Sequence, residues 1–240
     1  MSLPAGPPEQ IGVGLIAPFD LALDRELWRW VPDEVTLLLN RTPYVDDPVS
    51  IALAEAVSDS GDVSRATREL IAVAPRCIAY ACTSGSFVHG VAGQKRLVEA
   101  MCAAGAPQAV TTSGALLDAL CTLGIHRVAV ATPYVESLTV RLGEFLAEAG
   151  IDTVAGAQLG LSGEIWKVPY GVTTQLIRDA NSSDAQAVFV SCTNLATYDL
   201  IAPLEAELGK PVLTANQVTL WAALRRAGSA AIGPGQRLLT

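Results

Sequence analysis

Two cysteines lie in closely similar sequence settings and carry the clearest chemical signal of the chain. Cys82 ends the apolar run of IAYACTSGS, Cys192 ends that of AVFVSCTNL, and a threonine follows each. A strand that ends in this way places reactive groups at the carboxyl edge of a parallel sheet. A thiolate is a nucleophile and a base, and a thiol is an acid. We therefore predict a duplicated fold whose halves each contribute one thiol to a shared catalytic site.

A free cysteine can also serve merely as a small buried hydrophobe. That interpretation suits the other cysteines, which fall on predicted strand or helix faces: Cys77, Cys102 and Cys121. It suits Cys82 and Cys192 poorly, because polar residues follow them directly. No Lys, Arg or His supports either thiol in the sequence, so we expect backbone N–H groups, that of Gly85 among them, to favour the thiolate.

Short polar side chains beside the thiols are candidates for binding a substrate carboxylate. They are Thr83, Ser84, Thr193 and Asn194. Helix N-termini bind anions and are capped by such residues, so ordinary turn and capping roles remain an alternative. Tyr134 follows the run ATP at the end of a predicted strand. Its hydroxyl would reach the same carboxylate, or its ring would pack between two domains.

Apolar runs alternate with amphipathic patterns along the whole chain, which is typical of βα units and a mainly parallel sheet. The predicted strands are Ile11–Ala17, Val35–Leu39, Cys77–Ala81, Gln108–Thr111, Arg127–Thr132, Thr153–Ala157, Ala187–Ser191 and Pro211–Thr214. The clearest predicted helices are Gln94–Ala104, Ala115–Leu123, Glu136–Ala149, Tyr198–Leu208 and Val218–Ala227.

An internal repeat supports two similar halves. The segments Gly105–Gly124 and Gly209–Gly228 are equal in length and share Pro, Leu and Ala positions. Cys82 and Cys192 follow the third predicted strand of each half. We expect residues 1–108 with 213–240 to form the first α/β domain and residues 109–212 the second. The active site would then lie in the cleft between them.

Composition excludes several functional classes. The 240 residues are 50% hydrophobic and 17% charged, with a net charge of -8. This charge argues against a nucleic-acid partner, and no run approaches the length of a membrane span. The start, MSLPAGPPEQ, has no signal-peptide pattern, so we expect a loose leader and a cytoplasmic protein. The five cysteines contain no CxxC pair and neither histidine has a ligand partner, so no metal site is expected.

Three further features have competing interpretations. Gly12, Gly14 and Ala17 fit the spacing of a dinucleotide fingerprint, but no strand precedes them and Pro18 follows, so we place the glycines inside the first strand. Asp20 is expected to cap a helix that begins near Leu21. The segment SGEIWKVPYG, with Trp166 and Tyr170, is a candidate covering loop.

ACTSGS, SCTN, VAVATPY and LTANQVTLWAALR resemble the maleate cis–trans isomerase branch of the aspartate/glutamate racemase superfamily, to which arylmalonate decarboxylase is related. The resemblance runs from about Ile11 to Gly228. It implies two similar Rossmann-like (flavodoxin-like) domains with parallel sheets, related by a pseudo-twofold axis. It also implies that neither a metal nor an organic cofactor is needed. We expect a homodimer or a homotetramer.

The resemblance also implies roles for individual residues. The thiolate of Cys82 attacks the substrate or acts as base, Cys192 supplies and recovers a proton, and Tyr134 binds a carboxylate. The loop Pro18-Phe19-Asp20-Leu21 departs from the isomerase pattern, in which an Asn at this loop binds a carboxylate. An apolar ring and an acidic group suit a dianion poorly. A substrate with one carboxylate and an apolar arm is therefore expected, with Pro18 and Phe19 among its contacts.

Three functions remain open. The first is isomerisation or racemisation of a small carboxylic acid by the Cys82/Cys192 pair. The second is decarboxylation of a substituted malonate, which needs only Cys192 as proton donor; the related decarboxylase keeps only the second cysteine, so two thiols favour the first. The third is a non-catalytic module that binds a small carboxylate.

Overall fold

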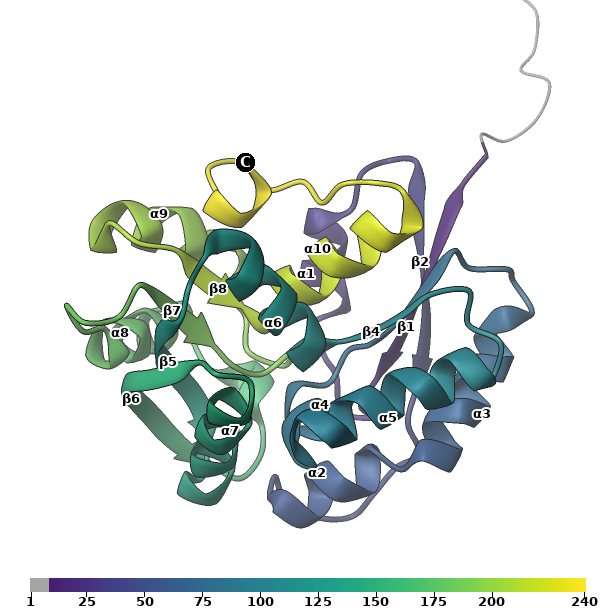
Figure 1. Ribbon diagram of the computed structural model, residues 1–240, viewed down its shortest axis with the longest axis horizontal. Coiled ribbons are helices and arrows are strands. Elements are labelled where there is room, and N and C mark those ends of the chain that lie inside the picture. The colour runs from purple at the N-terminus through teal and green to yellow at the C-terminus, as the bar shows by residue number, and fades with distance from the viewer. Residues whose placement is uncertain (1–8) are drawn as a thin grey trace, which may run out of the picture.

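The computed structural model describes residues 9–240, and the expected leader lies outside them except for its last two residues. Two four-stranded sheets, each with all strands parallel, form the centre of the molecule (Figure 1). Their strand orders are β2-β1-β3-β4 and β6-β5-β7-β8. The strands are β1 Ile11–Ala17, β2 Val35–Arg41, β3 Cys77–Tyr80, β4 Ala109–Thr111, β5 Arg127–Tyr134, β6 Asp152–Leu161, β7 Ala187–Val190 and β8 Val212–Thr214. The predicted α/β class with parallel sheets is confirmed.

Helices connect the strands. The α-helices are α1 Asp24–Leu27, α2 Ile51–Val57, α3 Ser60–Ile71, α4 Thr83–Phe87, α5 Gly90–Ala103, α6 Thr112–Leu123, α7 Glu136–Glu148, α8 Tyr170–Ala180, α9 Tyr198–Leu208 and α10 Ala215–Ala227. Short 3₁₀ turns occupy Trp28–Trp30, Ile165–Lys167 and Arg237–Leu239.

The central strands are buried on both faces, which explains their continuous apolar runs. Every residue of β3 and β7 is buried. Successive residues of β3 point to opposite faces of the sheet, so Ile78 and Tyr80 pack with α3 and α5, whereas Cys77 and Ala79 share a cluster with α10.

Gly12 and Gly14 lie within β1, as expected, and form no phosphate-binding turn. A Cβ on Gly12 would lie 3.0 Å from Leu38 and 3.3 Å from the Cα of Pro75. The glycine therefore allows β2 and the end of the loop before β3 to approach the first strand.

The repeat found in the sequence corresponds to two equivalent strand–helix units, β4–α6 and β8–α10. Thr111 caps α6 and Thr214 caps α10 through their side-chain oxygens, and both helices end at a left-handed glycine, Gly124 and Gly228. The two helices pack against each other. In addition, α10 follows the second sheet in sequence but packs on β1, β3 and β4 of the first.

The points at which the chain passes from one sheet to the other can be compared with the expected domain boundaries at 108/109 and 212/213. Strand β4 pairs with β3 and β8 pairs with β7, so the chain leaves the first sheet after residue 111 and the second after residue 214. The assignment of residues 1–108 with 213–240 and of residues 109–212 to separate folding units stays a prediction.

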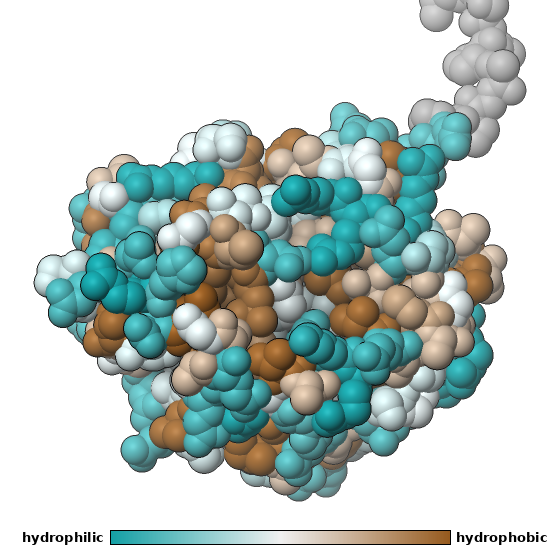
Figure 2. All heavy atoms as spheres, in the orientation of Figure 1, coloured by the Kyte–Doolittle hydropathy of each residue, from teal (hydrophilic) through white to brown (hydrophobic). Residues whose placement is uncertain are grey.

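Hydrophilic and hydrophobic residues are intermixed on the face shown in Figure 2. Isolated apolar residues of this kind are normal on protein surfaces. Across residues 9–240, none of the helices combines the length and the apolar character needed to cross a bilayer.

Candidate active site

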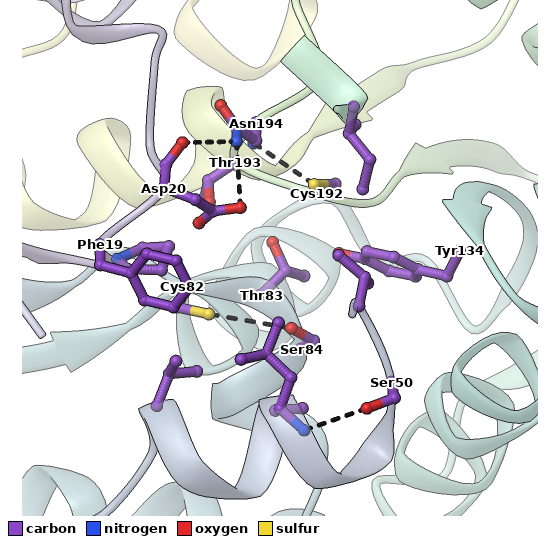
Figure 3. A pocket seen from close by; sticks show the side chains of 16 residues that line it. Phe19, Asp20, Ser50, Cys82, Thr83, Ser84, Tyr134, Cys192, Thr193 and Asn194 are labelled. Carbon is purple, nitrogen blue, oxygen red and sulfur yellow. Dashed lines mark hydrogen bonds between the residues drawn. The ribbon is translucent and has the colours of Figure 1, made fainter. Parts of the chain in front are cut away.

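The site residues predicted from the sequence all line one pocket, at the carboxyl ends of strands from both sheets (Figure 3). The cavity measures about 40 Å³, which is room for a few atoms. Its predicted lining residues are Pro18, Phe19, Cys82, Thr83, Ser84, Tyr134, Cys192, Thr193 and Asn194. The short polar segments that end β1, β3 and β7 therefore converge, together with the end of β5.

Cys82 follows β3 and occupies the N-cap position of the short helix α4, with ordinary extended backbone angles. Its side chain is buried, and its sulfur lies 3.8 Å from Ser84 Oγ. Burial raises the pKa of the thiol, while the N–H of Gly85 and the hydroxyls of Ser84 and Tyr80 oppose that shift. The predicted N–H support from Gly85 is thus present, but burial outweighs it.

Gly85 is required by this close packing. A Cβ at this position would collide with the hydroxyl of Tyr80 and lie 3.2 Å from Cys82 Sγ. The Tyr80 hydroxyl is itself fixed, because it donates to the carbonyl of Val57 at 2.8 Å. The absence of a side chain at residue 85 therefore lets the backbone N–H approach the sulfur.

One residue, Ser191, separates Cys192 from the end of β7, and Cys192 has a φ of 91°. A left-handed conformation of this kind costs a non-glycine residue about 1–3 kcal/mol. The N–H of Asn194 donates to Cys192 Sγ at 3.4 Å. Burial raises the pKa of Cys192 to about 12, opposed by the N–H of Asn194 and the hydroxyl of Tyr134. At neutral pH the Cys192 thiol is protonated and suited to donate a proton.

Asn194 lines the pocket but uses its amide to hold the loop after β1. Its Oδ1 accepts from the N–H of Ala22 at 3.0 Å, and its Nδ2 donates to the carbonyl of Asp20 at 2.9 Å and to Asp20 Oδ2 at 3.5 Å. The side chain predicted to bind substrate is therefore engaged within the protein, as a link between the two halves.

Asp20 does not cap a helix, so that expectation was wrong. Helix α1 begins at Asp24 with Leu23 as its N-cap residue. The carboxyl of Asp20 lines the pocket instead. Burial raises its pKa, while hydrogen bonds from its own backbone and from Asn194 and the charge of Arg41 oppose the shift. This position agrees with the resemblance, which put the loop Pro18-Phe19-Asp20-Leu21 at the substrate.

The segment that follows Cys192 makes a second link between the halves. The buried carboxylate of Glu26 accepts from the N–H of Thr197 at 3.0 Å and 3.1 Å and from its hydroxyl at 3.3 Å. Burial raises the pKa of Glu26, and these hydrogen bonds oppose the shift. The segment after Cys192 is thus anchored to α1 of the first half.

Thr83 offers a free hydroxyl to a ligand. Its side chain is 1% exposed, and within residues 9–240 its Oγ1 has no hydrogen-bond partner. The ring of Tyr134 packs edge-on against Phe87, and its hydroxyl accepts from Ser191 Oγ at 3.3 Å. Tyr134 also lines the pocket, and carboxylate binding by its hydroxyl stays a prediction. Burial raises the pKa of Tyr134 well above its usual range, so the hydroxyl remains a donor.

A mainly apolar cover closes the other side of the pocket, and the sequence indicated only the part of it near Trp166. Leu53, Ala54 and Val57 come from α2, and Ile165 comes from the second half. The remaining cover residues are Val49 and Ser50. Ser50 caps α2, and Val49 N donates to the carbonyl of Ser162 at 2.8 Å, so both halves hold the cover in place.

Trp166 and Tyr170 were expected in such a cover, but they do not line this pocket and are 44% and 37% exposed. Their neighbour Ile165 takes that place. The segment SGEIWKVPYG therefore does contribute to the cover, but through Ile165 and not through Trp166 or Tyr170.

Asp20 is the one acidic group in this lining, which includes no Lys, Arg or His within the described part of the chain. Carboxylate binding would depend on neutral hydroxyl and backbone N–H donors. Residues 9–240 also contain no group of three or more His, Cys, Asp or Glu side chains placed to hold a metal ion.

Comparison with known proteins places this site in a family. The family model described as arylmalonate decarboxylase matches residues 52–239. The chain is 35% identical to arylmalonate decarboxylase of Bordetella bronchiseptica over 153 residues, 62% of this chain and 64% of that protein. It is 28% identical to maleate isomerase of Geobacillus stearothermophilus over 161 residues, again 62% and 64%. The matched region thus spans slightly less than two thirds of either relative.

Solved structures extend the likeness to almost the whole fold. A double mutant of arylmalonate decarboxylase in its liganded form has a TM-score of 0.88 at 29% identity, covering 96% of this chain and 99% of that one. The maleate isomerase of Pseudomonas putida S16 has the same fold, with a TM-score of 0.85 at 24% identity, covering 96% and 98%. The two-domain Rossmann-like architecture and the resemblance seen in the sequence are confirmed. The chain belongs to the arylmalonate decarboxylase family.

Proposed function

We propose that this protein is a cofactor-independent isomerase or racemase of a small carboxylic acid, which acts on its substrate through a thiolate–thiol pair, Cys82 and Cys192. One observation carries the proposal: two thiols from equivalent strand ends, β3 and β7, line the same small pocket. Relatives named maleate isomerase support this type of reaction. The buried hydroxyl of Thr83, which lacks a partner within the described residues, supports a polar ligand.

The reaction balances without any further reactant. In racemisation the thiolate of one cysteine removes the proton next to the carboxylate, and the thiol of the other delivers a proton to the opposite face. In isomerisation the thiolate of Cys82 forms a C–S bond to one alkene carbon, and the π electrons take a proton from Cys192 at the other. Rotation about the resulting single bond and reversal of both steps release the isomer.

The electrostatics of the site suit a difficult proton abstraction. Burial raises the pKa of both thiols, so a small fraction of either is ionised at neutral pH. A thiolate with a raised pKa is correspondingly a stronger base once it forms. Water exclusion by the apolar cover then strengthens the hydrogen bonds to a bound carboxylate.

Decarboxylation of a substituted malonate is a second candidate, favoured by the apolar cover of Leu53, Val57 and Ile165 and by the 35% identical relative. The bond to one carboxylate breaks, its electron pair stays on the neighbouring carbon, and Cys192 protonates that carbon. The thiolate then regains a proton from water. Cys82 has no part in this reaction.

Proton NMR in D₂O tests both candidates on one panel: maleate, aspartate, glutamate, hydantoins and arylmalonates. It detects geometric isomerisation, deuterium incorporation and loss of CO₂. For the two-thiol reaction we expect Cys82→Ala and Cys192→Ala each to lower turnover by about 10²–10⁴-fold. Cys121→Ala changes an exposed thiol outside the pocket and serves as the matched control.

The pattern of losses separates the candidates. Activity that survives Cys82→Ala but not Cys192→Ala assigns decarboxylation. Full turnover in both variants contradicts thiol catalysis. Ligand-dependent stabilisation with no turned-over compound in the panel favours a binding protein instead.

A further inference from the structure

The loop that carries Asp20 is held at one side of the pocket, and Asp20 belongs to the pocket lining. The loop that carries it is held on both sides, since the N–H of Leu21 donates to the Pro18 carbonyl at 3.1 Å and the N–H of Ala22 donates to Asn194 Oδ1 at 3.0 Å. Asn194 Nδ2 also donates to the Asp20 carbonyl at 2.9 Å. These bonds hold the backbone of residues 20–22 beside the pocket, while the carboxyl of the exposed Asp20 has one long contact, 3.5 Å from Asn194 Nδ2.

The negative charge of Asp20 has little local compensation. Asn194 Nδ2 is 3.5 Å from Asp20 Oδ2, a long contact, and its other bond goes to the backbone. Arg41 acts on Asp20 through its charge, but its guanidinium binds both oxygens of Asp24 at 3.0 Å and does not line the pocket. A ligand in the pocket would therefore experience the Asp20 charge, screened in part by solvent because residue 20 is exposed.

The two sides of the pocket differ in character. Phe19 and Asp20 lie on one side in Figure 3 and Tyr134 lies on the opposite side, with Thr83 between them. The hydroxyls of Thr83 and Tyr134 suit a carboxylate. The other side offers an aromatic ring and an anion, which suit an uncharged arm.

From this arrangement we propose that Asp20 is a specificity-determining residue, which restricts the site to acids that carry a single carboxylate and place an uncharged arm beside Phe19. The inference rests on the proposed function, that the site takes a small carboxylic acid. For a second carboxylate on the Asp20 side of the cavity we take a separation of about 6 Å from the Asp20 carboxyl. At an effective dielectric constant of about 20, that repulsion corresponds to a roughly hundredfold loss of affinity.

Binding of two matched acids tests the proposal. Maleate carries two carboxylates, and cis-but-2-enoate has a methyl group in place of one of them. Their dissociation constants are measured by calorimetry at pH 8 for the wild type, Asp20→Asn and Asp47→Asn. Asn keeps the shape of residue 20 and can still accept from Asn194. Asp47 is exposed in the loop before α2 and lies outside the pocket, so its variant has the same change in net charge.

We expect Asp20→Asn to improve maleate binding relative to cis-but-2-enoate by roughly tenfold to a hundredfold, the upper value being the full repulsion removed. Asp47→Asn should leave the ratio unchanged. Asp20→Ala is a second variant, which removes the carboxyl entirely, and circular dichroism checks that each variant folds. If neither Asp20 variant gains maleate affinity over the monoacid, or if Asp47→Asn gains as much, the proposal is overturned.

Because binding rather than turnover is measured, this proposal and the proposed function can fail separately. A shifted binding ratio without any turnover contradicts the enzyme and leaves the role of Asp20 standing. Turnover of dicarboxylates by the wild type, unchanged in Asp20→Asn, contradicts the role of Asp20 and leaves the enzyme standing.

Discussion

The surroundings of Cys82 and Cys192 differ more than their sequences do. Cys82 has ordinary backbone angles and is supported by Ser84, Gly85 and Tyr80 of its own half. Cys192 has a φ of 91°, and the segment that follows it is tied to the first half through Asn194 and Glu26. Two equivalent strand ends have thus acquired separate kinds of support.

This difference indicates how each thiol depends on the rest of the molecule. The groups that support the Cys82 thiol come from β3 and α4, with the Val57 carbonyl fixing the Tyr80 hydroxyl. That of Cys192 also depends on contacts across the two halves. We therefore expect substitutions that weaken the contact between the halves to change the reactivity of Cys192 more than that of Cys82.

The largest expected difference concerns ionisation. Burial raises the pKa of Cys192 from its ordinary 9.0 to about 12, so at pH 8 its thiolate fraction is roughly a thousandfold below that of an unperturbed thiol. A raised pKa keeps the thiol protonated to higher pH. The rate of Cys192 alkylation by iodoacetamide should therefore rise about tenfold per pH unit from pH 7 to 10 without a plateau.

Peptide mapping by mass spectrometry follows each cysteine in that experiment, with exposed Cys102 and Cys121 as references for reagent access. Cys82 should react faster than Cys192, because three groups oppose the effect of burial there and two at Cys192. A plateau for Cys192 below pH 9 would show that its surroundings do not hold the proton.

The next effect concerns the support within the first half. Gly85→Ala should lower the free energy of unfolding by about 1–3 kcal/mol, because the added methyl group collides with the fixed Tyr80 hydroxyl. Gly143→Ala in α7 is the matched control: nothing lies within 4 Å of its added Cβ. Helix propensity should make that variant about 0.5–1 kcal/mol more stable. Urea denaturation measures both, and equal stability of the two variants would contradict the packing argument.

The smallest effect concerns the support across the halves. Asn194→Ala removes the acceptor of the Ala22 N–H and the donor to the Asp20 carbonyl, and should cost about 1–2 kcal/mol of stability. Ser84→Ala, which loses only a 3.8 Å contact to sulfur, should stay within about 0.5 kcal/mol of the wild type. Faster alkylation of Cys192, but not of Cys82, is expected in Asn194→Ala. If both thiols respond alike, the two supports are not separate.

Much of the fold could be predicted because each strand is a short apolar run bounded by turn residues. The pocket followed from the same pattern, since polar residues after parallel strands gather at one edge. The thiols, Thr83, Ser84 and Tyr134 were placed in this way, and all line the pocket.

What the sequence could not reveal depends on contacts between distant residues. Asn194 and Ala22 are 172 positions apart, and nothing local distinguishes an asparagine that binds a ligand from one that holds a loop. The local sequence of Asp20 resembles a helix cap, and only the family resemblance put its loop at the substrate. Leu53 and Val57 carry no chemical signal, and their place in the pocket depends on how α2 docks.

The position of α10 has a consequence for biosynthesis. A protein chain is made from its N-terminus, so β1, β3 and β4 leave the ribosome long before Ala215–Ala227, the helix that packs on them. Until α10 has been synthesised, the apolar side chains on that face of the first sheet lack the helix that covers them. A chain shortened after residue 214 would consequently keep all eight strands, yet leave that face of the first sheet without the helix that covers it.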